Sequence, residues 1–584
     1  MRQKLGWVTT GVAAVAGTVL IGLGPAALAE ADGGSVQILA VNDFHGNLDA
    51  LAGVAGSLIR RDDSGQQQSV QAGGIARMAT LVKQARQGQP RSVTVGAGDL
   101  IGGSPLMSAS YHDEPTVHAL EALGLEVSSV GNHEFDEGRD ELVRITKGGC
   151  HPVDGCSEPG VEYPGAKFEY LAANVVDTRK DRPVLRPYWV KNFSGTKIGF
   201  IGLTTRDTPS VVVKSGIEGL QFADEVRTID RYARELDQKG VKAIVVLIHE
   251  GAEKKNPLYD FKCDADGPAS GISGPIKSIA AKATPLVDLF ISGHSHEPYV
   301  CRVDDPAGRP RVITQAGSFG RTFTDIRFDV ARNGDVVRDS VQAVNKLVDL
   351  STAEDPEVKA EVDKWRKRSE EIANRPVGYI SQDILGRGAT TAETPLGDML
   401  ADSQVEGTRQ HGAQLAFMNT GGMRADLVHA AAGSEGAGVV TYGEAFQIQP
   451  FGNLLVTMDL TGEQLLDVLR EQYSGSNEQW PRLLQLSDGL RFSVDLSRSG
   501  ADRLLADTVR IDGEPVRPGQ TYRVTTNAFL SEGGNGFPSL AKGTNRVNGG
   551  TDLDAFVEYL KAHSSADKPL PAPAANRVTF VGGA

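Results

Sequence analysis

The chain has 584 residues, of which 40% are hydrophobic and 23% are charged, and its formal net charge is -14. This length exceeds what one hydrophobic core usually supports, so two domains are expected. The negative charge argues against nucleic acid as the partner, because binding to a phosphodiester backbone requires a basic surface. A small anionic substrate is still compatible with it, since metal ions and arginines can override net charge locally.

The N-terminal segment predicts export. Arg2 and Lys4 precede an apolar segment over about residues 5–24, and an Ala-Leu-Ala sequence at 27–29 fits a signal peptidase site. We interpret residues 1–29 as a secretory signal peptide, with an uncleaved N-terminal anchor as the alternative. The expected location is secreted or associated with the cell envelope. No stable membrane insertion is expected after cleavage, because no other stretch of the sequence is long and apolar enough to span a bilayer.

The four cysteines fit an oxidising compartment. Cys150 and Cys156 have a spacing that closes a small loop, and Cys263 and Cys301 would form the second pair. The alternative is a Cys/His metal site around His151. The absence of Cys-x-x-Cys spacing, together with the exported context, favours disulfides.

Five strand-like apolar runs in the first half of the chain each end in polar residues. The runs cover residues 35–41, 91–97, 127–130, 241–248 and 286–291. They lead into Asn42-Asp43-Phe44-His45-Gly46, Gly98-Asp99, Gly131-Asn132-His133-Glu134-Phe135-Asp136, His249-Glu250-Gly251 and Gly293-His294-Ser295-His296. Strand ends are where α/β folds place their chemistry. Any single histidine here could be structural, but five of the eleven in the chain lie in these motifs.

Seven of these side chains form a mixed oxygen and nitrogen ligand set without a thiolate. They are Asp43, His45, Asp99, Asn132, His249, His294 and His296. Seven ligands are too many for one tetrahedral ion and suit two divalent cations, of Zn, Mn, Co or Fe, that share a carboxylate. We expect Asp99 to bridge, with Asp43, His45 and His296 on one ion and Asn132, His249 and His294 on the other.

The predicted pair of cations indicates phosphoryl transfer. Two cations roughly 3.5–4 Å apart can hold a hydroxide between them and stabilise an in-line displacement at phosphorus. His133 would point away from the cations and stabilise developing charge or protonate the leaving oxygen. Asp136 would accept the other ring N–H and fix the tautomer of His133.

Domain boundaries can be predicted from the sequence pattern. Residues 36–345 alternate strand-like runs with helical patterns such as 114–123, which is typical of layered α/β folds. A linker helix is expected within residues 350–376, with Val358, Val362, Trp365 and Ile372 at helical spacing. Residues 377–584 form a second α/β domain.

The strand-end motifs together resemble the signature of calcineurin-like metallophosphoesterases. With the second domain, the chain resembles the secreted 5′-nucleotidase and UDP-sugar hydrolase family over nearly its whole mature length. The resemblance implies a metallophosphoesterase sandwich followed by a substrate-binding domain.

The resemblance also implies substrate-binding residues in the second domain. Asn419 and Arg424 lie in a stretch similar to the family's phosphate-binding loop, and a guanidinium group suits phosphate. Phe451 and Phe529 correspond to the aromatic residues that sandwich the base; either could instead belong to the core. Two positions depart from the family pattern. Asn535 replaces an Asp that contacts the ribose, and Arg387 lies a few positions away from an expected arginine.

The sequence therefore predicts a secreted dimetal phosphohydrolase. It would release phosphate from nucleoside 5′-phosphates by attack of a metal-bridged hydroxide and could extend to nucleotide pyrophosphates such as UDP-sugars. The alternatives are a 2′,3′-cyclic-nucleotide phosphodiesterase with 3′-nucleotidase activity and a non-catalytic nucleotide-binding protein. The sequence does not indicate the oligomeric state.

Overall fold

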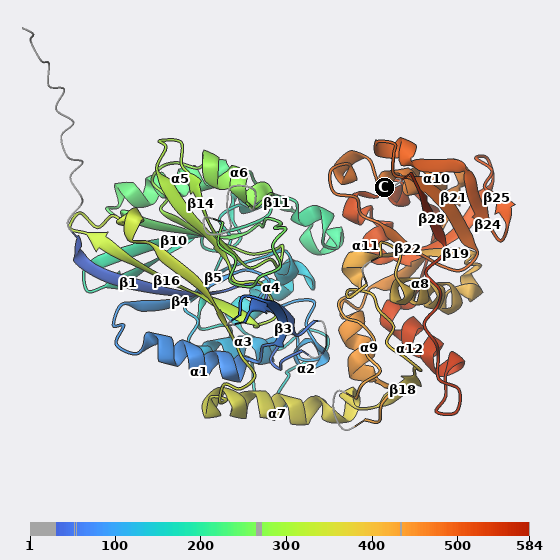
Figure 1. The fold of residues 1–584 in the computed structure, drawn as a ribbon, viewed down its shortest axis with the longest axis horizontal. Helices are drawn as coiled ribbons and strands as arrows, with labels where there is room; N and C mark the ends of the chain where they lie inside the picture. Colours follow the sequence, from blue (N-terminus) through green and yellow to red (C-terminus); the bar gives the residue numbers. More distant parts are fainter. Residues whose placement is uncertain are drawn as a thin grey trace, which may run out of the picture.

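A computed structural model describes residues 31–582 except 52, 54, 63, 264–270, 390 and 432–434. The predicted signal peptide, residues 1–29, lies outside the described residues. Figure 1 shows two halves, the first coloured blue to yellow-green and the second orange to red, with helix α7 (Pro356–Ala373) along the lower edge. Within the described part of the chain, no helix has the length and apolarity needed to cross a membrane.

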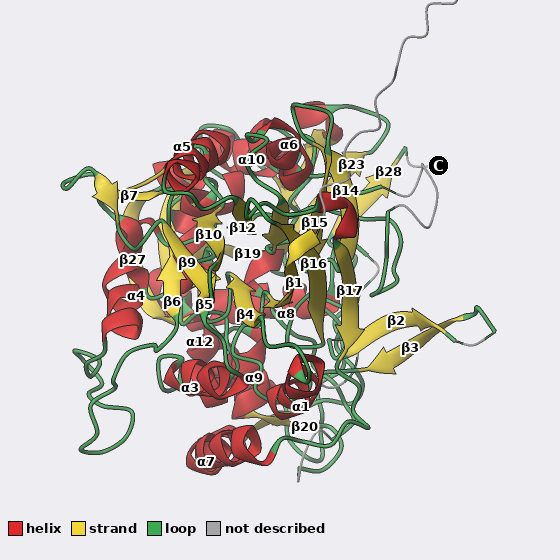
Figure 2. Ribbon diagram, turned by 90° about the vertical axis from the view of Figure 1, so that its left-hand side faces the viewer, coloured by secondary structure: helices red, strands yellow, loops and turns green. Residues whose placement is uncertain are grey.

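The first half is a sandwich of two six-stranded sheets with helices on both outer faces (Figure 2). One sheet has the order β17 (Gln342–Leu347), β16 (Thr322–Ala331), β1 (Ala31–Val41), β4 (Ser92–Ala97), β5 (Val127–Ser129) and β6 (Glu169–Leu171). The other has the order β14 (Tyr299–Asp304), β15 (Pro310–Gln315), β13 (Leu289–Ser292), β12 (Ala243–His249), β10 (Thr196–Thr204) and β9 (Tyr188–Phe193). In each sheet four neighbouring strands run parallel. The predicted α/β sandwich is therefore confirmed.

Strand β12 shows why the sandwich forms. Val245 and Leu247 belong to the core between the sheets, whereas Val246 and Ile248 belong to the core beneath the outer helices. Because successive side chains of a strand point to opposite faces, a strand buried on both faces is a continuous apolar run. The outer helices are α5 (Glu225–Gln238) and α6 (Pro275–Lys282) on this side, and α1 (Ile75–Arg86), α3 (Glu114–Leu123) and α4 (Gly138–Lys147) on the other.

Helix α7 lies against the first half of the chain and contacts α1 and α3. The side chain of Asp355 accepts hydrogen bonds from the first backbone N–H groups of the helix, a typical N-cap. Val358, Val362 and Trp365 are buried, as their spacing predicts. Ile372 is 51% exposed, contrary to expectation, since the last turns of the helix extend beyond α1 and α3 toward the second half (Figure 1). The predicted domain boundaries remain predictions.

The second half is built around a five-stranded sheet of order β22 (Leu484–Leu486), β19 (Leu415–Asn419), β26 (Thr521–Asn527), β21 (Leu454–Thr461) and β27 (Thr544–Thr551). Helices α8 (Pro395–Gly407) and α12 (Asp552–His563) share one core with it, and α10 (Gly462–Glu471) shares the other. Its further elements are α9 (Tyr442–Ile448), α11 (Ala528–Ser531), the pair β18 (Pro376–Tyr379) and β20 (Val439–Thr441), and a sheet of β25 (Glu514–Pro515), β24 (Leu504–Ile511), β23 (Leu490–Asp495) and β28 (Val578–Val581).

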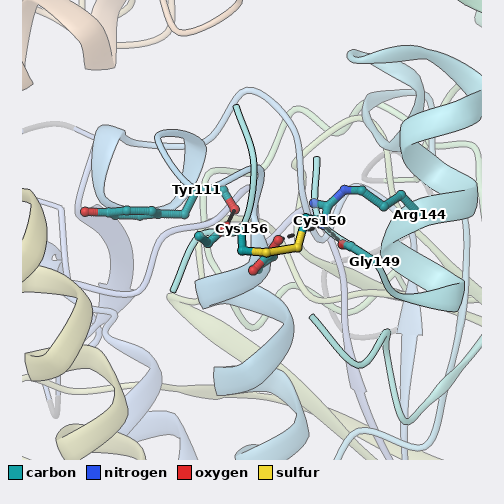
Figure 3. Close-up of a disulfide and its surroundings, with 7 residues drawn as sticks. Tyr111, Arg144, Gly149, Cys150 and Cys156 are labelled. Carbon is teal, nitrogen blue, oxygen red and sulfur yellow. Dashed lines mark hydrogen bonds and ion pairs between the residues drawn. A yellow bond between two sulfur atoms is a disulfide. The ribbon is translucent and has the colours of Figure 1, made fainter. Parts of the chain in front are cut away.

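Both predicted disulfides are present. Cys150 pairs with Cys156 in the loop after α4 (Figure 3), and Cys263 pairs with Cys301 on β14. Because Cys150 and Cys156 are paired, they offer no thiolate, so the alternative of a Cys/His metal site around His151 is wrong.

The remaining small elements are the hairpin β2 (Ser57–Arg61) and β3 (Gln67–Gln71), helix α2 (Leu106–Ala109), and the sheet of β11 (Leu220–Phe222), β7 (Val175–Asp177) and β8 (Arg182–Pro183).

Candidate functional site

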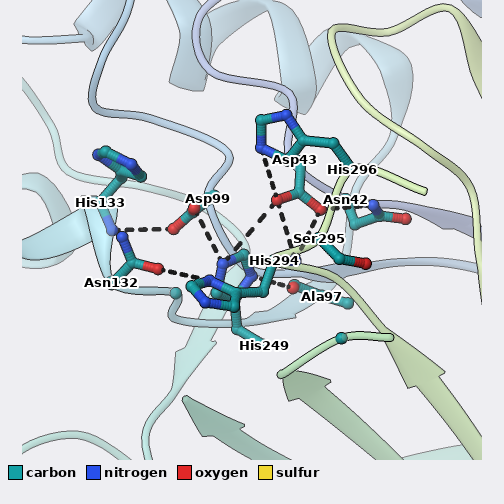
Figure 4. Close-up of polar contacts among 12 residues, drawn as sticks. Asn42, Asp43, Ala97, Asp99, Asn132, His133, His249, His294, Ser295 and His296 are labelled. Carbon is teal, nitrogen blue, oxygen red and sulfur yellow. Dashed lines mark hydrogen bonds and ion pairs between the residues drawn. The ribbon is translucent and has the colours of Figure 1, made fainter. Parts of the chain in front are cut away.

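The first of two clusters at the strand ends contains Asp43, His45 and His296. Their ligand atoms all lie within 4.8 Å of one another. His296 Nε2 is 3.2 Å from His45 Nε2 and 3.3 Å from Asp43 Oδ1. Because β1 and β13 end at the same edge of the sandwich, residues 251 positions apart in sequence meet here (Figure 4).

The second cluster contains Asp99, His249 and His294, again within 4.8 Å of one another. Asn132 joins it, with its Oδ1 3.0 Å from His294 Nδ1. Asp99 Oδ2 lies 2.9 Å from His249 Nε2 and 3.6 Å from His45 Nε2, which belongs to the first cluster. One carboxylate oxygen therefore lies between the two sets, where the sequence predicts a bridge.

The donor atoms fit bound cations. His45 Nδ1–H donates to the carbonyl of Gly102 and His249 Nδ1–H donates to the carbonyl of Ala97, each at 2.8 Å. The Nε2 atoms therefore face the two clusters, where His249 Nε2 has Asp99 Oδ2 as its neighbour at 2.9 Å. Backbone carbonyls that fix the tautomer in this way are usual behind metal-binding histidines.

Charge in the clusters also favours cations. Burial lowers the pKa of both His45 and His296 well below its usual value, and Arg424 adds to the effect, so their facing nitrogens are unprotonated. Burial raises the pKa of Asp99, but the charged His249 and His133 imidazoles lower it overall to well below its usual range. Burial lowers the pKa of His249, but the Asp99 and Asp43 carboxylates raise it overall to about 10, so a cation bound there would replace the proton of this ring. Ionised carboxylates and neutral imidazoles are the forms that bind divalent metal ions.

Backbone strain concentrates at the same place. Five of the seven predicted ligands have positive φ between 47° and 77°, a region that costs free energy for residues other than glycine. They are Asp43, His45, Asp99, His294 and His296. Such strain persists only where the surrounding structure imposes it, and it is typical of functional sites.

His133 and Asp136 form a pair beside the clusters. His133 Nδ1–H donates to Asp136 Oδ2 at 2.8 Å, while its backbone N–H donates to Asp99 Oδ1 at 2.8 Å. Burial lowers the pKa of His133, but the Asp136 and Asp99 carboxylates raise it overall above its ordinary value. The Nε2 atom is left to the cavity, and the raised pKa favours the protonated ring that a general acid needs.

Two supporting residues were missed by the sequence predictions. Glu134 accepts backbone hydrogen bonds from Asp99 at 2.9 Å, Leu100 at 2.8 Å and Gly131, so it fastens two strand-end loops together. Burial and the Asp99 charge raise the pKa of Glu134 to about 7, although these N–H groups act in the opposite direction. Asn42 donates to Asp43 Oδ2 at 2.6 Å and orients that carboxylate.

One cavity of about 790 Å³ joins these clusters to the second half of the chain. Arg424 lies closest to the metal ligands, with its Nη2 3.5 Å from His45 Nε2. The ring of Phe451 stacks on that of His133, with centroids 5.5 Å apart and an interplanar angle of 16°. Residues from both halves therefore line a single site.

The other predicted substrate residues line the same cavity. Arg387 lies there despite its displaced sequence position, with its Nε–H donating to the carbonyl of Met423 at 2.9 Å. Asn419 is 4% exposed and Phe529 is 9% exposed. Asn535 Oδ1 accepts a hydrogen bond from Arg482 at 2.8 Å, an arginine that the sequence did not single out.

Comparison with known proteins decides the family. Residues 36–298 match the calcineurin-like phosphoesterases and residues 376–542 match the 5′-nucleotidase C-terminal domain. A cell wall protein of Listeria monocytogenes, Lmo0130, is 33% identical over 98% of this chain and 73% of its own length. The chain belongs to the 5′-nucleotidase family. As the family match implies, it is a metal-dependent phosphoester hydrolase that binds divalent metal.

Other relatives of this 5′-nucleotidase family member differ in length and name. Endonuclease YhcR of Bacillus subtilis is 32% identical over 92% of this chain, but the chain spans only 40% of that protein. The crystal structure of a 5′-nucleotidase precursor from Thermus thermophilus superposes with a TM-score of 0.73 at 25% identity, covering 94% of this chain and all of that one. The fold is thus shared over most of the chain with a solved structure of this family.

Proposed function

We propose that the protein is an exported dimetal phosphohydrolase that releases phosphate from nucleoside 5′-phosphates, with nucleotide pyrophosphates such as UDP-sugars as a further candidate class. The observation that carries this proposal is the single cavity, lined by both the ligand clusters and the second-half residues Arg424, Phe451 and Phe529. Export is supported by the predicted signal peptide, by two disulfides, and by a relative named as a cell wall protein.

The strand-end residues would hold the metal. Asp99 lies between the two sets of ligands, with Asp43, His45 and His296 on one side and Asn132, His249 and His294 on the other. When bound, two divalent cations of Zn, Mn, Co or Fe supply Lewis acidity toward phosphoryl oxygens and lower the pKa of water.

The remaining chemistry belongs to side chains. Arg424 and Arg387 offer guanidinium donors to the phosphate oxygens, and guanidinium matches phosphate with two parallel hydrogen bonds. His133 donates its Nε2 proton to the ribose oxygen that leaves phosphorus, while Asp136 holds the opposite nitrogen. Water supplies the oxygen of the new bond to phosphorus as the bond to the ribose oxygen breaks, so the products are a free nucleoside and inorganic phosphate.

The nucleoside end would be held by rings and amides. Phe451, which stacks on His133 and has Arg424 Cζ 5.7 Å from its ring centroid, and Phe529 are the two rings that the cavity offers to a base. Stacking of this kind tolerates base identity, since every base has a π-face. Asn419 and Asn535 offer donors and acceptors to the sugar.

A second candidate is a 2′,3′-cyclic-nucleotide phosphodiesterase with 3′-nucleotidase activity. The observation that favours it is the pairing of uncharged Asn535 with Arg482, which makes the ribose end of the cavity more cationic. A non-catalytic nucleotide-binding protein is disfavoured, because binding alone would not require the His133–Asp136 pair.

Substrate profiling tests the proposal. Purified protein loaded with Mn²⁺ or Zn²⁺ would be offered AMP, 3′-AMP, 2′,3′-cyclic AMP, UDP-glucose, ATP and a short DNA oligonucleotide, and the products identified. We expect phosphate release from AMP that a chelator abolishes and added metal restores. If 2′,3′-cyclic AMP is hydrolysed and AMP is not, the second candidate is the better assignment. Cleavage of the oligonucleotide would contradict the expectation that nucleic acid is not a substrate.

A further inference from the structure

The loop that follows Asp99 contains two consecutive glycines that pack against the site. Gly102 and Gly103 have positive φ, of 81° and 56°. A Cβ atom added to Gly102 would lie 2.2 Å from the carbonyl oxygen of His133, so this position has no room for a side chain. A Cβ atom added to Gly103 would lie 3.2 Å from the ring of Phe451. The loop therefore lies between the proposed general acid and a ring of the second half of the chain.

The same loop holds a metal ligand. The Gly102 carbonyl accepts the His45 Nδ1–H at 2.8 Å, which leaves Nε2 of that ring to face the first ligand cluster. A carbonyl can fix a tautomer only if its own position is fixed, because a hydrogen bond weakens steeply when its angle departs from linear. The orientation of His45 therefore depends on what holds this loop in place.

A buried carboxylate anchors the loop. The backbone N–H of Gly102 donates to Asp113 Oδ2 at 3.0 Å. The other carboxylate oxygen, Oδ1, accepts the hydroxyl of Ser108 at 2.6 Å, and this hydroxyl lies 2.6 Å from Thr116 Oγ1. Asp113 is 5% exposed, and Ser108 is fully buried. Because each of its oxygens has a partner, the carboxylate is held in one orientation.

The backbone of Asp113 is also unusual for its place in the chain. It is the N-cap residue of α3, where an aspartate usually accepts the first N–H groups of the helix with its side chain. Here the side chain makes no capping hydrogen bond, and the residue has φ 60° and ψ 10°. This left-handed conformation costs free energy for residues other than glycine, although aspartate visits it more readily than most. The carboxylate is therefore directed toward Gly102 and away from the helix that it would usually cap.

We propose that Asp113 is a positioning residue of this site. Through Gly102 it fixes the tautomer and orientation of His45, and it keeps the loop packed against His133 and Phe451. Asp113 does not belong to the cavity lining, so it would act without touching metal or substrate. The consequence for hydrolysis rests on the proposed function, whereas the consequence for His45 can be measured without a nucleotide.

Three variants separate the carboxylate from the backbone conformation. Asp113→Gly removes the carboxylate, and glycine adopts the left-handed conformation without a steric cost. Asp113→Asn keeps an oxygen for the Gly102 N–H, and its amide group can donate to the Ser108 hydroxyl, so this variant should behave like wild type. Asp181→Gly is the matched control, because Asp181 is an exposed aspartate of the first half with φ 49°.

Calorimetric titration with Mn²⁺ measures the ligand clusters without a substrate. Loss of a group behind a metal-binding histidine usually lowers metal affinity about 10–100-fold. We therefore expect one Mn²⁺ dissociation constant to rise about tenfold in Asp113→Gly and to stay at its wild-type value in Asp113→Asn and Asp181→Gly. The kcat for AMP should fall in Asp113→Gly alone. If AMP is not hydrolysed by wild type but the change in metal affinity is found, the proposed function fails and the role of Asp113 stands.

Magnetic resonance of metal-free protein, with isotope labels on its histidine nitrogens, gives a measurement that needs no metal. The His45 Nδ1–H is buried and hydrogen-bonded, so it should exchange slowly with water and give a signal that His45→Gln removes. This signal should be lost in Asp113→Gly and retained in Asp113→Asn.

A second site of substitution covers the case in which Asp113→Gly does not fold. Ser108→Ala removes the hydroxyl that orients the carboxylate, so it should weaken the His45 signal in the same direction but to a smaller extent. A folded Asp113→Gly variant with wild-type Mn²⁺ affinities and an unchanged His45 signal would overturn the proposal. An unchanged signal in Ser108→Ala would overturn it where only that variant folds.

Discussion

Replacement of Asp136 by asparagine isolates the part of catalysis that depends on one charge. Asp136 Oδ2 accepts the His133 Nδ1–H at 2.8 Å, and the pair lines the cavity. Hydrogen bonds to charged groups contribute about 1.5–3 kcal/mol and are roughly twice as strong as neutral ones. Asparagine keeps an acceptor of the same shape but loses the charge. The free energy by which residue 136 stabilises protonated His133 should therefore fall by roughly 1–1.5 kcal/mol. We therefore expect kcat for AMP to fall about tenfold.

A double-mutant cycle makes this prediction specific. His133→Ala alone should lower kcat by about 10² or more if His133 is the general acid. Asp136→Asn should then add little, since its effect acts through His133. Asp140→Asn, an exposed change in the first turn of α4, is the control and should leave kcat unchanged. An equal loss from Asp136→Asn with and without His133 would refute the reasoning.

Three further changes test the support of the site. Glu134→Gln replaces one carboxylate oxygen by a donor and leaves a buried backbone N–H unpaired, so it should lower the free energy of unfolding by about 1–3 kcal/mol. The control, Glu357→Gln at an exposed position, should leave it unchanged, and urea titration would measure both variants. Arg424→Lys removes the two-pronged phosphate contact, so kcat/KM for AMP should fall roughly 10–100-fold, and an unchanged kcat/KM for AMP would contradict that role. The disulfides close loops of 38 and 6 residues. Cys263→Ser should therefore cost about 4 kcal/mol of unfolding free energy and Cys150→Ser about 2 kcal/mol on the loop-entropy estimate, an order that calorimetry would check.

The convergence of the strand-end residues could be predicted because their positions follow from topology. Asp43, Asp99 and Asn132 follow successive parallel strands of one sheet, and His249 and His294 follow parallel strands of the other. Carboxyl ends of parallel strands lie at a common edge, so sequence order alone brings these side chains together. The backbone conformations with positive φ and the tautomers set by carbonyls could not be predicted in this way.

Contacts between distant loops could not be predicted from the sequence, for a physical reason. Glu134 is recognisable as part of a motif, but its three backbone partners come from two loops whose approach is a tertiary event. Arg482 lies in a loop whose path over the cavity has no periodic signal. Ile372 has the helical spacing of a buried residue but is exposed, because correct spacing does not guarantee that a neighbouring element lies opposite the last turns of a helix.

The proposed function requires that two divalent cations, which the ligand clusters on either side of Asp99 would hold, are both needed for nucleotide hydrolysis. Electron paramagnetic resonance of protein titrated with Mn²⁺, recorded beside AMP hydrolysis, tests it most directly, because an exchange-coupled pair is distinguishable from isolated ions. The coupled signal and the activity should rise together, and Asp99→Asn should remove both. Full AMP hydrolysis with only isolated manganese, or in Asp99→Asn, would contradict it.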